Sequence, residues 1–142
     1  MATTITTGVQ YSGLWTRGQQ MQATAAGTWT GLPLLYAWGR NDYGQLGLNS
    51  TTNYSSPKQV SSTTVWKDVS AGDFQSLGVT FAGALFSWGR NNQGQLGLNN
   101  TTYYSSPKQV GALTNWLQAS TGYYVSHAIK TDGTLWGWGQ NV

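Results

Sequence analysis

A fifty-residue internal repeat is the feature that most constrains what this chain can fold into. The Trp-Gly-Arg-Asn of residues 38–41 recurs at 88–91, and a third Trp-Gly step follows at 138–139. Between these marks, the Gly-Gln-Leu-Gly-Leu-Asn of residues 44–49 returns at 94–99. A register kept without insertion over this length indicates tandem copies of one supersecondary unit. Such units must stack, because each needs its neighbours to bury a core.

Within each unit, short runs of strand-forming residues alternate with turn residues. The expected strands are residues 34–38, 65–70, 76–80 and 84–88, with a weaker one at 58–60 opened by Pro57. Asp132-Gly133 lies between two apolar runs and predicts a hairpin, since Gly accepts the positive φ of such turns. We therefore expect an all-β fold of four-stranded antiparallel blades of the β-propeller type. About two to three repeats are present, which predicts a partial propeller.

Five tryptophans follow the repeat and are expected in its core. They are Trp38, Trp88, Trp138, Trp66 and Trp116. Large rings at equivalent places in successive units are typical of a core shared between neighbours.

Several motifs together resemble the regulator of chromosome condensation repeat. They are Leu-Tyr-Ala-Trp-Gly-Arg-Asn at 35–41, Gly-Gln-Leu-Gly-Leu at 44–48, Ser-Pro-Lys-Gln-Val at 56–60 and Ala71-Gly72. The resemblance covers about residues 34–142 and implies propeller blades of four strands, usually about seven to a ring. The founding member is a nucleotide exchange factor for a small GTPase, whereas many members are interaction modules. No motif here carries the exchange activity, and a fold alone does not establish function.

The first thirty-one residues do not match the repeat. Thr16–Gln19 has the form of a capping box and precedes a stretch that ends at Gly27, which predicts a short helix. We expect an N-terminal cap or anchoring segment at residues 1–31 and the tandem repeats at 32–142. The Ser-Gly-Leu-Trp-Thr of residues 12–16 resembles a pattern in structural proteins of tailed bacteriophages. That resemblance implies a virion component.

The composition argues against several classes of function. Only 8% of the residues are charged, and the net charge of +3 is the balance of seven Lys and Arg against four Asp. The Lys and Arg are scattered singly, so no basic stripe for nucleic acid is present. No apolar run reaches the ~20 residues of a membrane span. The N-terminus has no signal-peptide pattern. Cysteine is absent from the sequence, which excludes disulfides and thiolate chemistry.

No catalytic or metal-binding arrangement is visible in the sequence. His127 is the only histidine, and Leu77 occupies its position in the preceding repeat. Asp132, the nearest acid in the sequence, is better explained as a turn residue than as the partner of a catalytic histidine. The four aspartates form no close pair that could hold a metal ion. We expect a protein that is not an enzyme and that uses no cofactor and no metal.

Aromatic and arginine side chains in the expected loops are the best candidates for binding. Loops carry binding residues more often than the elements they connect, and exposed tyrosines stack on sugars or form protein interfaces. The alternative is that most of these rings cover blade edges and that the arginines bridge blades. The candidates are Tyr43, Tyr54, Tyr103, Tyr104, Tyr123, Tyr124, Arg40 and Arg90.

The sequence leaves three functions open. The first is a virion protein of a bacteriophage, a decoration, fibre or tail-associated component that assembles with copies of itself or other virion proteins and contacts a host-surface glycan or protein. The second is a cellular protein–protein adaptor of the same repeat family, and the third is a carbohydrate-binding module. Because exposed edge strands of a partial propeller invite pairing, we expect an oligomer.

Overall fold

The structure is a computed structural model and describes residues 34–141, which form strands and no helix. Each strand is five to seven residues long. The strands are β1 (Leu35–Gly39), β2 (Tyr54–Val60), β3 (Trp66–Ala71), β4 (Gln75–Thr80), β5 (Leu85–Gly89), β6 (Tyr104–Gln109), β7 (Trp116–Thr121), β8 (Val125–Lys130) and β9 (Leu135–Gly139).

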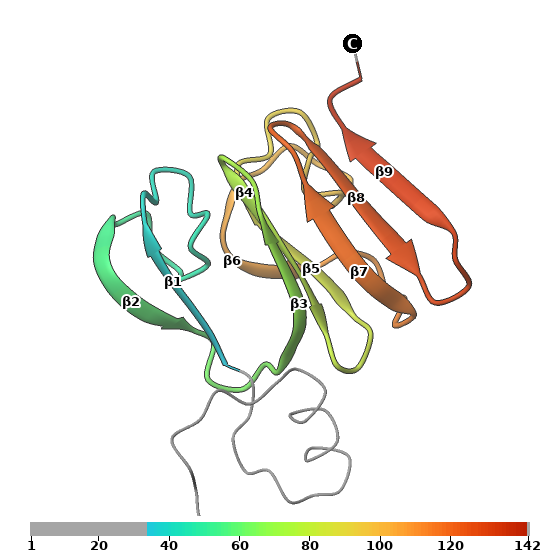
Figure 1. The fold of residues 1–142 in the computed structure, drawn as a ribbon. Coiled ribbons are helices and arrows are strands. Elements are labelled where there is room, and N and C mark those ends of the chain that lie inside the picture. The colour runs from blue at the N-terminus through green and yellow to red at the C-terminus, as the bar shows by residue number, and fades with distance from the viewer. Residues whose placement is uncertain (1–33, 142) are drawn as a thin grey trace, which may run out of the picture. The chain divides into compact units, whose positions relative to one another are not determined.

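The strands form three antiparallel sheets that follow one another along the chain (Figure 1). The first sheet contains β1 and β2, the second β3-β4-β5-β6, and the third β7-β8-β9. The second sheet is one complete four-stranded blade, so the expected all-β fold is confirmed. By the fifty-residue register, β7-β8-β9 repeat its first three strands and β1-β2 match its last two. The strands predicted at 34–38, 65–70, 76–80 and 84–88 are found within one residue of their expected bounds, whereas the weaker one predicted at 58–60 is longer and begins at Tyr54, so that Pro57 lies inside β2.

Neighbouring sheets pack through the first strands of each blade. Strand β7 lies against β3 and β4, and the buried cluster between them is apolar: it contains Leu77, Val79, Leu85, Trp116, Ala119 and Ala128. Polar contacts fix the alignment at the margin of this cluster. The Asp68 carboxylate accepts the Ala119 backbone N–H at 3.0 Å, and the Ser70 hydroxyl accepts that of Thr121 at 3.0 Å. The two blades are therefore held by both apolar burial and a specific register.

A buried asparagine closes the long loop of each repeat. Asn91 is fully buried, and its side-chain oxygen accepts the Leu96 backbone N–H at 2.9 Å. Its amide nitrogen donates to the backbone carbonyls of Asn100 and Thr102, at 2.8 and 3.1 Å. Asn41 repeats this arrangement in the preceding loop. One side chain thus satisfies several backbone groups that a loop without secondary structure would leave unpaired.

Each of these long loops is joined to the following blade through one backbone carbonyl. The carbonyl of Gln45 accepts hydrogen bonds from the Trp88 indole at 2.8 Å and the Ser76 hydroxyl at 2.9 Å. Fifty residues later, the carbonyl of Gln95 accepts the equivalent bonds from Trp138 at 2.9 Å and Ser126 at 2.7 Å. The repeated Gly-Gln-Leu-Gly motif is therefore a connection between one unit and the next.

The expectation that all five repeated tryptophans are core residues is wrong for Trp38. Trp66, Trp88 and Trp116 are at most 6% exposed, and Trp138 is half-buried. Trp38 is 58% exposed. The physical reason is the position of its strand: β1 pairs only with β2 in the described residues, whereas the equivalent β5 is flanked by strands on both sides.

The hairpin expected at Asp132-Gly133 joins β8 to β9, and Asp132 accepts the backbone N–H of Thr134 at 2.9 Å. The predicted N-terminal segment, residues 1–31, lies outside the described residues, and so does its short helix. Within residues 34–141 there is no helix that is long and apolar enough to span a membrane.

We predict that the close approach of Gly47 to Trp88 makes this glycine more sensitive to substitution than Gly94, which has the same backbone conformation. Gly47 has φ +74°, and a Cβ there would lie 2.8 Å from the Trp88 indole nitrogen. Gly94 has φ +73° and open space around its Cβ position. Both substitutions to Ala incur the left-handed penalty of about 1–2 kcal/mol. Gly47→Ala should lose an additional ~1–3 kcal/mol from overpacking.

The measurement is the free energy of unfolding from urea titrations of Gly47→Ala and Gly94→Ala. Equal losses in the two variants would contradict a packing role for Gly47.

Candidate functional site: an aromatic platform

Five aromatic rings gather where loops from all three sheets meet. They come from the β1–β2, β3–β4, β5–β6 and β7–β8 connections, which lie at the same ends of their strands. The rings are those of Tyr43, Phe74, Tyr103, Tyr123 and Tyr124, and we refer to them as the aromatic platform.

The rings of the platform form a continuous row. Tyr103 contacts Tyr43 with 5.8 Å between ring centroids, and Tyr43 contacts Phe74 at 5.3 Å. Phe74 contacts Tyr123 at 5.3 Å, and Tyr123 contacts Tyr124 at 4.3 Å. These pairs meet edge to face, an arrangement favoured by the quadrupole of aromatic rings. The row therefore joins residues that are up to 81 positions apart in the sequence.

Arg90 lies at the centre of the platform. Its guanidinium carbon is 5.0 Å from the Tyr43 ring centroid, 5.1 Å from that of Phe74 and 5.0 Å from that of Tyr124. It also donates a hydrogen bond to the Tyr124 hydroxyl at 3.0 Å. A guanidinium attracts the faces of aromatic rings, and the attraction strengthens where water is excluded. Arg90 thus binds together loops that come from three different sheets.

Backbone and amide hydrogen bonds hold the turns that carry these rings. The Arg90 N–H donates to the Phe74 carbonyl at 2.8 Å, and the Gln140 N–H donates to the Tyr124 carbonyl at 2.9 Å. The buried Gln75 side chain donates to the Gly122 carbonyl of the next blade at 2.8 Å. The β3–β4 and β7–β8 turns are consequently fixed relative to each other.

Two tyrosines present the platform to solvent. Tyr103 is 43% exposed and Tyr123 is 53% exposed. A hydrogen bond with Tyr124 raises the pKa of the Tyr123 hydroxyl above its ordinary value of 10.0. The hydroxyl is therefore protonated at neutral pH and can both donate and accept hydrogen bonds. Rings with a polar edge, held in place before a partner arrives, are well suited to binding.

The structure brings some of the predicted binding residues together and separates others. Tyr43, Tyr103, Tyr123, Tyr124 and Arg90 all belong to the platform. Tyr54 and Tyr104 do not: each stands at the start of an outer strand and lies against the lysine four residues later, with 5.5 Å between the lysine nitrogen and the ring centroid in both repeats.

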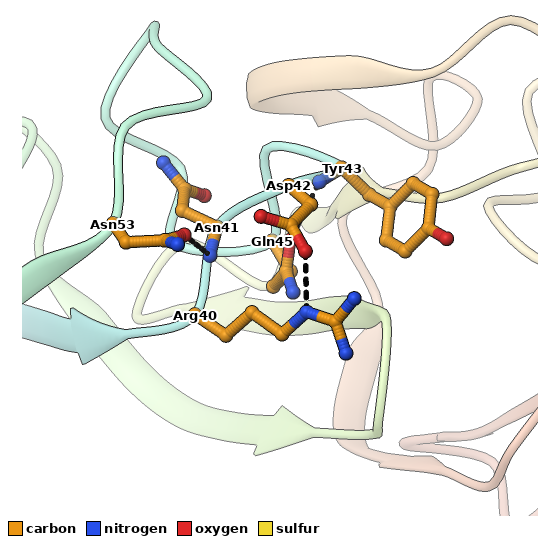
Figure 2. A network of polar contacts seen from close by, with 6 residues as sticks. All are labelled: Arg40, Asn41, Asp42, Tyr43, Gln45 and Asn53. Atoms are coloured by element: carbon orange, nitrogen blue, oxygen red, sulfur yellow. Dashed lines mark hydrogen bonds and ion pairs between the residues drawn. The ribbon is translucent and has the colours of Figure 1, made fainter.

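Arg40 is also separate from the platform, although it occupies the position of Arg90 in the preceding repeat. Its guanidinium pairs with the Asp42 carboxylate, and both groups are exposed (Figure 2). The Tyr43 ring extends away from this pair, and the neighbouring Asn41 backbone N–H donates to the Asn53 side chain at 2.6 Å (Figure 2). The two arginines therefore have different roles in spite of their equivalent positions.

One member of the platform, Phe74, was not among the predicted binding residues. Phe74 and Tyr124 occupy equivalent positions in successive repeats, fifty residues apart. Phe74 follows the turn Ala-Gly-Asp, and Tyr124 follows the equivalent turn Thr-Gly-Tyr. Aligning the two repeats would therefore have identified Phe74 as a loop aromatic.

Metal-ligating side chains do not cluster in the described residues. Residues 34–141 contain no group of three side chains able to hold a metal ion. His127 is exposed on β8, and its strand neighbours are Ser120 and Gly137. Asp132 bonds to Thr134 in the β8–β9 turn, as its role in a turn requires.

The Regulator of chromosome condensation (RCC1) repeat matches residues 34–79 and 82–129 of the sequence, and a second form of the repeat matches 66–95. The chain belongs to the RCC1 repeat family. The complete blade β3-β4-β5-β6 spans the junction between the two RCC1 matches. No curated protein sequence matches this RCC1-repeat chain.

Three solved structures resemble the chain in fold. Human WBSCR16 is 30% identical with a TM-score of 0.64, over 74% of this chain and 29% of its own. Prp20p of Saccharomyces cerevisiae is 24% identical with a TM-score of 0.65, over 75% of this chain and 29% of its own. The Prp20p structure was described together with its binding to Gsp1p and histones. Yeast RCC1 (Prp20) bound to Kap60 is 24% identical with a TM-score of 0.64, over 75% of this chain and 28% of its own. The RCC1-repeat chain thus spans less than a third of these proteins.

We predict that replacing Arg90 with Gln, the residue that the third repeat has at position 140, loosens the platform. The variant loses three ring contacts and the hydrogen bond to Tyr124. Arg90→Gln should therefore lower the urea midpoint of unfolding. Arg40→Gln is the matched control and should leave the midpoint nearly unchanged, since an exposed ion pair contributes little. A midpoint lowered equally by both variants would contradict the central role of Arg90.

Proposed function

We propose that this RCC1-repeat chain is a non-enzymatic protein-interaction module that binds its partner through the aromatic platform. The observation that carries the proposal is the row of five rings organised around Arg90, with Tyr103 and Tyr123 open to solvent. Tyrosine and arginine are the residues in which binding energy concentrates at protein interfaces. Membership of a repeat family with many interaction modules supports the same function.

The solved structures give this proposal further support. Prp20p binds Gsp1p and histones, and yeast RCC1 binds Kap60. Those activities belong to proteins more than twice as long, so they do not identify the partner of this chain. They do agree with a cellular adaptor better than with a virion component. The virion role rests on residues 1–31, which the structure does not describe, and it stays a prediction.

The test begins with selection of binders from a displayed library of peptides and small folded domains. Affinities of the recovered binders are then measured by calorimetry for the unaltered chain, Tyr103→Ala and Tyr123→Ala. We expect each substitution to weaken binding by about tenfold or more, as at interface hot spots. Phe81→Ala is the control: Phe81 is 44% exposed and lies in the β4–β5 turn, away from the platform.

A panel of glycans tested with the same variants distinguishes the carbohydrate-binding alternative. Glycan binding that disappears in Tyr103→Ala, without platform-dependent binding of any protein or peptide, would replace the proposal with a lectin function. Binders whose affinity is insensitive to both tyrosines would contradict the platform as the interaction surface.

A further inference from the structure

The first sheet lacks the inner half of a blade within the described residues. Strand β1 occupies the position of β5 and β9 in the repeat, and each of those strands pairs on its inner edge with β4 or β8. Strand β1 pairs only with β2 in residues 34–141. A cavity of about 340 Å³ lies between β1 and β3, and its walls include Ala37, Trp38, Val69 and Ala71.

The repeat specifies what would fill this space. Where β3-β4 meet β7, the Ser70 hydroxyl accepts the Thr121 N–H, and Leu77 is fully buried against the facing blade. In the register, Ala71 of the cavity wall corresponds to Thr121. A complementary pair of strands must therefore present a hydroxyl at the position of Ser70 and a side chain at the position of Leu77.

Such a pair of strands is present and uncovered in the same chain. Strands β7 and β8 carry Ser120 at the position of Ser70 and His127 at the position of Leu77, and both residues are exposed. Ser120, His127, Ile129 and Leu135 line a second cavity of about 160 Å³ on this surface. The chain thus has both halves of a blade junction, one beside β1 and the other on β7-β8, at opposite ends of the series of sheets (Figure 1).

We propose that a second copy of the chain completes this junction by strand exchange. The β7-β8 hairpin of one copy enters the cavity of the next, and β1 of that next copy takes the place of β9. The pairing follows the register of β8 with β9, in which Ser126 is opposite Trp38, His127 opposite Ala37, and Ile129 opposite Leu35. Each completed blade has the order β7-β8-β1-β2, with the first two strands from one copy and the last two from another.

The exposure of the exchanging strands favours this pairing. Trp38 is 58% exposed and in the completed blade would occupy the environment of Trp88, which is 2% exposed. Its indole would reach the Gln95 carbonyl that Trp138 now occupies. Strand β9 gives up the Trp138 bond to this carbonyl, whereas its Leu135 and Trp136 are already 68% and 49% exposed. The favourable contribution comes from the two uncovered faces, because the exchange places the β7-β8 hairpin against the apolar walls of the cavity beside β1.

The repeat pattern favours a second copy of the chain, rather than residues 1–31, as the segment that fills the cavity beside β1. Strands β7 and β8 belong to the repeat, whereas residues 1–31 do not match it. After exchange each copy contributes two complete blades. Since propellers typically contain four to eight blades, a closed ring requires two to four copies.

The first experiment is the mass of the purified full-length chain in solution, by light scattering on a sizing column over a range of concentrations. We expect a species of two to four times the 15.4 kDa chain mass. Trp38→Lys places a charge in the junction and should reduce the mass to that of one chain. Phe81→Lys, which changes another exposed ring outside both flanks, should keep the oligomer.

The second experiment tests the register directly, which is possible because the chain has no cysteine of its own. Ala37 and His127 become neighbours only between copies, at a pair equivalent to Leu77 and Ser87. The double variant Ala37→Cys/His127→Cys should form covalent oligomers under mild oxidation, and Ala37→Cys alone should not form the ladder of higher species.

A chain that is monomeric at all concentrations would overturn the exchange, and so would an oligomer insensitive to Trp38→Lys that lacks the cross-link. A monomer with Trp38 shielded from a fluorescence quencher would show that the cavity is filled from within the chain. None of these outcomes depends on the platform, because the binding assays with Tyr103→Ala and Tyr123→Ala are separate.

Discussion

The hydrogen bonds to one backbone carbonyl in each repeat determine how the rest of this structure is arranged. The Gln45 carbonyl accepts a serine hydroxyl and a tryptophan indole from the following blade, and the Gln95 carbonyl does the same fifty residues later. A buried carbonyl must be paired, so the loop can lie at only one distance from the next sheet. Because the glycine two residues later has no side chain, the indole can pack directly on the loop backbone.

This connection explains why the loops are rigid enough to form a binding surface. Connecting loops are normally the mobile part of a fold. Here Asn41 and Asn91 satisfy the loop carbonyls from inside, while the tryptophan indoles hold the loops from outside. The rings of the platform are therefore preorganised, and a partner need not supply the free energy to order them.

Much of the fold could be predicted from the sequence, because the repeat places the same residues in the same environment. The strands, the Asp132-Gly133 hairpin and the four-stranded blade all follow from local patterns. Trp38 could not be assigned correctly, since the burial of a tryptophan depends on the strand beside it. Its sequence neighbours match those of Trp88, but the inner strands that cover Trp88 have no counterpart beside β1 in residues 34–141.

The binding platform could be predicted only in part, for a related reason. Residues near the ends of strands could be identified as loop aromatics, yet their grouping depends on contacts between different repeats. Arg90 shows the consequence: it is surrounded by Tyr43 from the preceding repeat and Tyr124 from the following one.

An identical residue in an equivalent position need not have the same role, as Arg40 demonstrates by pairing with Asp42. The fifty-residue repeat therefore sets the positions of the side chains, whereas departures from it determine which position becomes the site. Tyr43 is replaced by Gln93 in the next repeat and Arg90 by Gln140. The aromatic platform around an arginine consequently occurs once in residues 34–141, at the blade that has neighbours on both sides.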